Sequence, residues 1–379
     1  MLIRRCAVLF LEPREDLDID WTALFAGDGP LGATMRWMAL APHLGEEVEV
    51  TLDEVAALGG IGLTLWQESA DCAQQYGAAV IARLLECGLL IGDDARFRER
   101  DETLRSQNWR PLSAAAHMFS RWGDMRVDKG MQFPSFEELV VSYGTPPGPV
   151  IERCAEGEAI ALPYPDRARL DDTLFQRYTG RNFDPAAALP IATVARLLQR
   201  AFGSQGEREM APDAFVLKKL SPSAGGLHPV EAYVLAQRVE GIAPGLYHYH
   251  PVRHALEPLT AMDTAQTAEL AMRMVADQDW FVDAPMMVVL AARVERNFWK
   301  YRNHAKAYRA LLLDAGHLSQ TFYLLATEAG MPAFVTAAVN EIDIERGVGL
   351  DPLKDMVIAV CGCGPASGAR DTVELRYEP

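Results

Sequence analysis

The sequence predicts an α+β protein with a winged-helix-like N-terminal part and a larger second part in which helices flank a mixed central sheet. Its 379 residues exceed what one ordinary core holds, so two domains are expected. Residues 145–149 (Thr-Pro-Pro-Gly-Pro) cannot continue a helix or a central strand. Helical and strand-like patterns alternate beyond this break, but no G-x-G-x-x-G opens a helix, which argues against a Rossmann domain. We therefore expect an N-terminal domain at 1–145, a linker at 146–170 and a second domain at 171–379.

Two predicted helices and a hairpin define the first part. Thr51 opens a capping signal followed by a short helix. Residues 73–87 then repeat apolar side chains at helical spacing and are followed by Gly88. Residues 89–91 are interpreted as a strand of a short β-hairpin with its turn at 92–94. Two helices followed by a hairpin are the outline of a winged helix.

The second part is predicted to combine amphipathic helices with buried strands. Its longest helix carries an apolar stripe and ends at Gly330. One continuous apolar run, at 286–290, is typical of a strand buried on both faces. The expected elements are helices at 189–202 and 307–329 and strands at 231–239, 286–290 and 356–360, the last broken by Gly362.

Composition narrows the classes of function. The formal net charge of −16 disfavours nucleic-acid binding, which needs basic surface to neutralise phosphates. The apolar run within residues 1–12 is too short for a signal peptide, and we interpret it as an edge strand. No stretch reaches the roughly 18 apolar residues of a membrane span. Six cysteines in a long chain suit reduced thiols. The sequence thus predicts a cytoplasmic protein with neither a nucleic-acid nor a membrane partner.

Two segments contain residues suited to holding a cofactor. Arg177, Thr179 and Arg181 lie just before a predicted helix. Guanidinium groups and a hydroxyl suit a phosphate or a ribityl chain, although a solvated surface loop has the same composition. Residues 221–229 (SPSAGGLHP) are mostly small, so their backbone can approach a flat ligand closely. Taken alone, this segment is better explained as an ordinary Gly/Ser loop.

A third segment could supply acid–base chemistry. Lys300 and Tyr301 are adjacent, and a lysine beside a phenol can act as base and acid if burial lowers the lysine pKa. The alternative is a surface lysine. Cys361 and Cys363 lack a second cysteine pair, so no zinc site is expected there. His248, His250 and His254 lie close together in a hairpin-like stretch, and no metal is expected there either. Asp314 and His317 share one helix face and are expected to form a buried pair.

The order of these segments resembles the nitroreductase superfamily of FMN proteins. More narrowly, it resembles the SagB-like or McbC-like branch, which oxidises azolines to azoles in ribosomally made peptides. The resemblance covers about residues 170–370. It rests on residues 221–231 (SPSAGGLHPVE), 241–249 (GIAPGLYHY) and 313–320 (LDAGHLSQ), which occur in the family's order.

The resemblance implies FMN as the cofactor and a position for each part of it. The two arginines and Thr179 of the first segment would hold the phosphate and the ribityl chain. Residues 221–226 would pack along the isoalloxazine, typically across a homodimer interface. The family's segment near flavin N5 falls on 330–337, where Pro332 and Ala337 depart from the pattern. The implied cofactor contacts are Arg177, Thr179, Arg181, Ser221, Pro222, Ser223, Ala224, Gly225, Gly226, Ala337 and Arg370.

The resemblance also implies a catalytic pair. In the azoline-oxidising branch a Lys-Tyr pair is catalytic, and Lys300-Tyr301 matches it. Aromatising an azoline removes one hydrogen as a proton and one as a hydride. FMN N5 takes the hydride, and a desolvated lysine hydrogen-bonded to a tyrosine can take the proton. Lys306 and Tyr308 are a competing assignment for the pair.

Three functions remain open at this point. The first is an FMN-dependent dehydrogenase that acts on a precursor peptide, as a homodimer and with a cyclodehydratase as a further partner. The second is an NAD(P)H-dependent nitro- or quinone-type reductase. The third is a flavin-holding scaffold that grips the peptide inside a synthetase complex. The N-terminal part would either bind a peptide strand along its β-edge or serve as a packing or dimerisation appendage.

Overall fold

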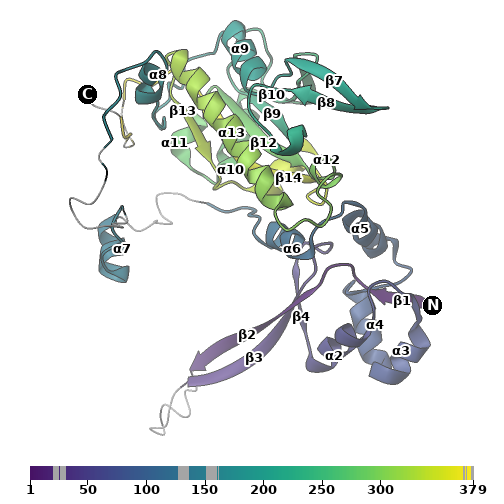
Figure 1. The fold of residues 1–379 in the computed structure, drawn as a ribbon. Helices are drawn as coiled ribbons and strands as arrows, with labels where there is room; N and C mark the ends of the chain where they lie inside the picture. Colours follow the sequence, from purple (N-terminus) through teal and green to yellow (C-terminus); the bar gives the residue numbers. More distant parts are fainter. Residues whose placement is uncertain are drawn as a thin grey trace.

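A computed structural model of the chain describes residues 1–19, 25, 31–126, 136–150, 160, 162–369, 372 and 374–376. The second part is built on one six-stranded sheet in the order β11-β10-β9-β12-β14-β13 (Figure 1). All pairings between these strands are antiparallel. Parallel pairing enters at isolated bridges, Thr179–Ala333 and Leu189–Val239, so the expected mixed character is confined to them. The strands are β9 (Val230–Ala236), β10 (Gly245–His250), β11 (Ala255–Ala261), β12 (Met286–Arg293), β13 (Ala333–Thr336) and β14 (Asp355–Cys363).

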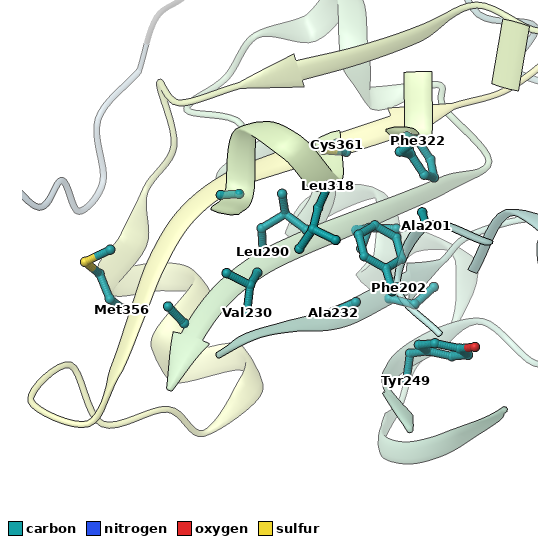
Figure 2. Close-up of a cluster of buried hydrophobic side chains, with 14 of the residues drawn as sticks. Ala201, Phe202, Val230, Ala232, Tyr249, Leu290, Leu318, Phe322, Met356 and Cys361 are labelled. Atoms are coloured by element: carbon teal, nitrogen blue, oxygen red, sulfur yellow. The ribbon is translucent and has the colours of Figure 1, made fainter. Parts of the chain in front are cut away.

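Helices cover both faces of this sheet, because alternate strand residues point to opposite sides. In β12, Val288 and Leu290 pack with the helices α9 and α13, whereas Val289 packs with α10 and α14. Figure 2 shows Leu318 and Phe322 of α13 in the first of these cores. The helices are α8 (Asp171–Gln176), α9 (Ile191–Ala201), α10 (Thr264–Met274), α11 (Asp279–Val282), α12 (Val294–Phe298), α13 (Ala307–Glu328), α14 (Glu341–Val348) and the 3-10 turn η1 (Ala224–Gly226).

The expected elements of the second part are confirmed within a few residues, with one correction. Strand β14 is not broken at Gly362 but runs through it to Cys363. A Cβ on Gly362 would lie 2.3 Å from the ring of Phe334, so glycine lets the neighbouring strand pack closely. A two-stranded hairpin, β7 (Gly206–Ala211) and β8 (Ala214–Lys218), leads into the SPSAGG segment.

The N-terminal part contains a small sheet, β5-β1-β6, and the helices that cover it. Thr51 closes a capping box with Glu54, as predicted. The expected helix at 73–87 is wrong, because Gly77, with φ 96°, separates two helices. These elements are β1 (Leu2–Arg5), β5 (Gln67–Glu68), β6 (Leu90–Ile91), α2 (Leu52–Gly60), α3 (Ser69–Tyr76) and α4 (Ala78–Glu86).

Two further expectations for this part are wrong. Strand β1 is not an edge strand, since it pairs with β5 on one side and β6 on the other. The hairpin expected at 89–94 does not form either, because β6 pairs with β1 and a helix, α5 (Ala95–Ser106), follows the turn. The sequence reasoning also missed a long projecting hairpin of β2 (Phe10–Ile19) and β3 (Leu31–Leu40), with β4 (Glu47–Val50) on its inner end (Figure 1).

The two parts share a core across the predicted domain boundary. Val8, Leu104 and Trp109 belong to the same buried cluster as Leu311 and Phe322 of α13. Helix α6 (Pro111–Phe119) lies in this contact region, and α7 (Phe136–Tyr143) precedes the Pro/Gly-rich stretch. The described cysteines are free thiols, and Cys154 lies outside the described residues. In the part of the chain that the structure describes, no helix has the length and apolar character to cross a membrane.

Candidate functional site

The turn after α12 brings Lys300 and Tyr301 onto the SPSAGG segment. Gly225 adopts φ +62°, and a Cβ there would lie 2.6 Å from the Tyr301 hydroxyl and 2.8 Å from Lys300 Nζ. A side chain at this position would displace both groups from where they lie, and the positive φ also favours glycine. Tyr301 is half-buried and Lys300 is exposed. The sequence-predicted loop and the sequence-predicted pair therefore meet at one point.

Helix α13 anchors this loop. The Asp314 carboxylate accepts hydrogen bonds from the Ser223 hydroxyl and from the Ala224 amide, the latter at 3.1 Å. The Ser221 hydroxyl lies 2.8 Å from that of Thr321, about two turns further along the same face of α13. The expected buried pair of Asp314 with His317 is wrong, because His317 is exposed and the Asp314 carboxylate binds the loop instead. A buried carboxylate that accepts two donors fixes the backbone beside Gly225.

A second cluster lies further along the same helix. Tyr323 is buried, and its hydroxyl hydrogen-bonds with the Thr179 hydroxyl at 3.1 Å and accepts from the Val335 amide at 3.2 Å. The Arg177 guanidinium lies over the Tyr323 ring, 5.4 Å from its centroid. Burial raises the pKa of Tyr323, so its hydroxyl stays neutral and able to donate. Nothing in the sequence distinguishes Tyr323 from the other apolar and aromatic residues that repeat at helical spacing along this helix.

The remaining predicted cofactor residues are more dispersed. The backbone amide of Arg181 donates to the Glu374 carboxylate at 2.7 Å. Arg181 also lines a different cavity, of about 450 Å³, which Trp280 lines as well. Ala337 is exposed directly after β13. Arg370 lies outside the described residues. Arg177 and Thr179 are thus the members of the first motif that share the Tyr323 cluster.

The competing pair is placed differently. Lys306 is exposed at the start of α13, and Tyr308 packs against Trp109 with ring centroids 6.5 Å apart. Burial raises the pKa of Tyr308. The atoms nearest a Cβ at Gly225 belong to Tyr301 and Lys300, not to this pair.

Other titratable groups have structural partners. His248 lies between Glu257 and Glu231, at 2.7 and 3.3 Å, and these contacts, the one with Glu231 first, raise its pKa. Cys361 and Cys363 are buried in β14, and burial raises the pKa of both thiols. Among the described residues, no group of histidine, cysteine and acidic side chains is arranged to hold a metal ion.

One buried cation beside the loop was not anticipated. Lys219 is 4% exposed and, with Ser223, His228 and Asp314, lines a cavity of about 10 Å³. That volume is close to the lower limit for holding one water molecule. Burial lowers the pKa of Lys219. Its position two residues before the SPSAGG segment was the only signal in the sequence.

Comparison with known proteins identifies the class. Residues 174–364, half of the chain, match the family model described as "Nitroreductase family", and the chain belongs to this family. In the solved structure of the E. coli microcin synthetase McbBCD complex with truncated pro-MccB17 bound, one chain shares the fold. The TM-score is 0.51 at 22% identity, covering 70% of this chain and 94% of that one.

The curated relatives include peptide-processing proteins. The chain is 29% identical to "Putative nitroreductase MJ1384" of Methanocaldococcus jannaschii, over 49% of this chain and 87% of that protein. It is 30% identical to the trifolitoxin-processing protein TfxB of Rhizobium leguminosarum bv. trifolii, over 43% of this chain and 44% of TfxB. It is 28% identical to the microcin B17-processing protein McbC of Escherichia coli, over 46% of this chain and 61% of McbC. The matches thus span less than two thirds of the two peptide-processing relatives, and they agree with the resemblance seen in the sequence.

Proposed function

We propose that this chain is an FMN-dependent dehydrogenase that oxidises azoline rings to azoles in a ribosomally made peptide. The observation that carries the proposal is the meeting of Lys300 Nζ and the Tyr301 hydroxyl at Gly225 of the SPSAGG loop. A proton acceptor and a wall of small residues for a flat cofactor then lie at the same point. Loss of a proton and a hydride from one ring requires both groups within reach of that ring.

The residues present fit FMN. Arg177 supplies a guanidinium for a phosphate, and Thr179 supplies a hydroxyl for the ribityl chain beside the buried Tyr323. The backbone at Gly225 and Gly226, both at positive φ, offers a surface that a side chain would fill. We assign the remaining predicted contacts, Arg181, Ala337 and Arg370, to the same cofactor on the family resemblance alone. When bound, FMN would accept the hydride.

The side chains of this chain handle the proton. Lys300 Nζ would accept it from the azoline carbon, and the Tyr301 hydroxyl would hydrogen-bond to the amine and orient it. Lys300 is exposed in the single chain, so the bound peptide or a second subunit would have to exclude water from it. The azoline then loses one proton and one hydride and becomes the aromatic azole.

The test uses the purified full-length protein and a precursor peptide that already carries azolines. A flavin absorption spectrum and a mass loss of two hydrogens per ring are expected. Lys300→Ala should keep the flavin spectrum and lose the mass change. A flavin-loaded wild-type protein that leaves the peptide mass unchanged, with oxygen and with an added quinone as acceptor, would reject the proposal.

A reductase is the second candidate, and one observation favours it. The similarity to "Putative nitroreductase MJ1384" covers most of that protein, without reference to a peptide. Fast reduction of the bound flavin by NAD(P)H, retained in Lys300→Ala, would support this reading. A protein that binds flavin without turnover, yet is needed by a partner cyclodehydratase, would instead be the scaffold.

We further propose a homodimer in which the SPSAGG loop reaches the cofactor of the second subunit. Leu312 and Leu313 of α13 are 43% and 63% exposed close to the loop anchor Asp314, as a subunit contact would require. Arg177→Ala and Lys300→Ala proteins, each inactive, should regain activity when co-expressed, since one site of the mixed dimer would be intact. No recovery in isolated mixed dimers would place both residues in a site formed by one chain.

A further inference from the structure

The turn that carries Lys300 and Tyr301 packs against Trp109, a residue from the other side of the predicted domain boundary. Trp109 is 4% exposed, and its ring meets the ring of Phe298 edge-on, with centroids 4.9 Å apart. Phe298 ends α12, two residues before Lys300. On the far side of the turn, Tyr308 packs on the same indole. One side chain thus contacts the segment both before and after the catalytic pair.

Backbone hydrogen bonds strengthen this contact. The Asn303 amide donates to the Asn108 carbonyl at 3.1 Å, directly beside Trp109. Within the turn itself, the side-chain amide of Asn297 donates to the Ala307 carbonyl at 3.1 Å, and this hydrogen bond joins the two ends of the turn. The turn is therefore held as a unit. Residues 108 and 109 support it from outside the second part, and Arg296 of α12 donates to the Leu227 carbonyl at 3.1 Å from within it.

Trp109 is itself fixed against the second part. Its indole N–H donates to the Leu353 carbonyl at 2.9 Å, and its ring stacks on His117 at 5.4 Å. His117 in turn hydrogen-bonds to the Pro352 carbonyl at 3.0 Å. Arg100 of α5 pairs with Asp351 at 2.7 Å in the same loop. A buried indole whose N–H is hydrogen-bonded and whose ring contacts three other rings has little freedom to shift.

We propose that Trp109 is a positioning residue for the reaction and that it sets the distance of Lys300 and Tyr301 from the SPSAGG loop. This inference rests on the proposed function, because it assigns the pair its role. The physical reason is the short approach at Gly225. A misplacement of about 1 Å at reacting groups can cost about 10²-fold in rate. Residues 95–126 then belong to the catalytic unit rather than to a separable appendage.

The experiment compares Trp109→Leu with Phe202→Leu in the full-length protein. Phe202 is equally buried in the same core, but it packs on Phe322, on the α9 side. The first readout is the rate at which acetic anhydride acylates Lys300, measured by peptide mass mapping against the exposed Lys218 as internal standard. We expect a several-fold change in Trp109→Leu and none in Phe202→Leu. This arm needs neither flavin nor substrate, so it stands if the proposed function fails.

The second readout is turnover of an azoline peptide per bound flavin. For Trp109→Leu we expect kcat to fall about 10²-fold with KM and flavin content little changed, because the turn acts in the chemical step. Trp109→Phe keeps the ring contact but lacks the donor to Leu353, and it should recover most of the loss. If Trp109→Leu does not fold, Trp109→Met, which also has no ring but fills the space with a longer and more adaptable side chain than leucine, carries both readouts with the same expected changes. Lys300 labelling and kcat equal to those of Phe202→Leu would overturn the proposal.

Discussion

The two halves of the candidate site are held in different ways along one helix. Near the C-terminal end of α13, Tyr323 joins Thr179 and Val335 by hydrogen bonds between groups of the second part alone. Near the N-terminal end, the turn with Lys300 packs against the ring of Trp109, which is distant in sequence, and makes one backbone hydrogen bond to Asn108. Hydrogen bonds fix direction as well as distance, whereas packing transmits shifts of its neighbours. We therefore expect that substitutions which shift the turn with Lys300 leave the cluster of Tyr323 and Thr179 in place.

The largest expected effect separates catalysis from cofactor binding. Lys300→Ala should lower azoline oxidation by about 10²–10⁴-fold, the usual contribution of a positioned base, and leave the flavin content unchanged. Lys306→Ala is the matched control, because this exposed lysine is the competing assignment. Single-turnover rates of the two variants measure the difference. A larger loss in Lys306→Ala would transfer the catalytic role to the pair at 306 and 308.

The next effect concerns the joint between the two halves. Asp314→Ala removes the carboxylate that accepts from Ser223 and Ala224, at about 1.5–3 kcal/mol per charged hydrogen bond. Without these two hydrogen bonds the SPSAGG loop should shift, and we expect the protein to release flavin on gel filtration. The control is Asp343→Ala, a buried carboxylate that accepts from the Asp124 amide away from the loop. Flavin loss of the same size in both variants would mean that global stability, not the loop, is responsible.

Acid should lower the stability of the folded protein through His117. Burial, with a smaller contribution from Arg121, lowers the pKa of His117 from 6.5 to about 4. Between pH 6.5 and pH 4 His117 is therefore protonated in the unfolded chain but neutral in the folded chain. Its contribution to the free energy of unfolding is complete above pH 6.5 and is lost as the pH falls toward 4. The shift corresponds to about 3 kcal/mol. Urea unfolding between pH 7 and pH 4 measures the slope, which His117→Gln should reduce; an unchanged slope would exclude this histidine as its source.

The smallest expected effect lies on the cofactor side. Tyr323→Phe removes the hydroxyl that accepts from Val335 and joins Thr179, which costs about 1–3 kcal/mol for the group left unsatisfied. FMN affinity should fall about tenfold while the kcat of the loaded protein is retained. Tyr247→Phe is the control, since its hydroxyl donates to the Ala243 carbonyl on an exposed hairpin. A fall in kcat without a fall in affinity would contradict the division of the site into two halves.

Local signals in the sequence predicted much of the fold. The capping box at Thr51 and the long helix over 307–328 were found because they depend on residues within a few positions. The break at Gly77 was missed, although a glycine at positive φ is its cause. The hairpin of β2 and β3 was missed because its strands carry no clean alternation of apolar and polar residues.

For the site, the sequence supplied the parts but not their arrangement. The SPSAGG loop, the arginine motif and the Lys-Tyr pair were recognised as segments, and the family followed from their order. That Lys300 and Tyr301 meet Gly225, that Asp314 holds the loop and that Tyr323 joins Thr179 to Val335 are contacts between distant residues.

By itself, then, the sequence determined membership of the nitroreductase family and the residue types of the site, because both depend on short contiguous segments. Only the tertiary structure decided which lysine and tyrosine face the loop and which residues support them. Trp109 illustrates the reason. It lies beyond the predicted linker from Phe298, and nothing local marks the contact, yet the buried core that both residues share sets their distance.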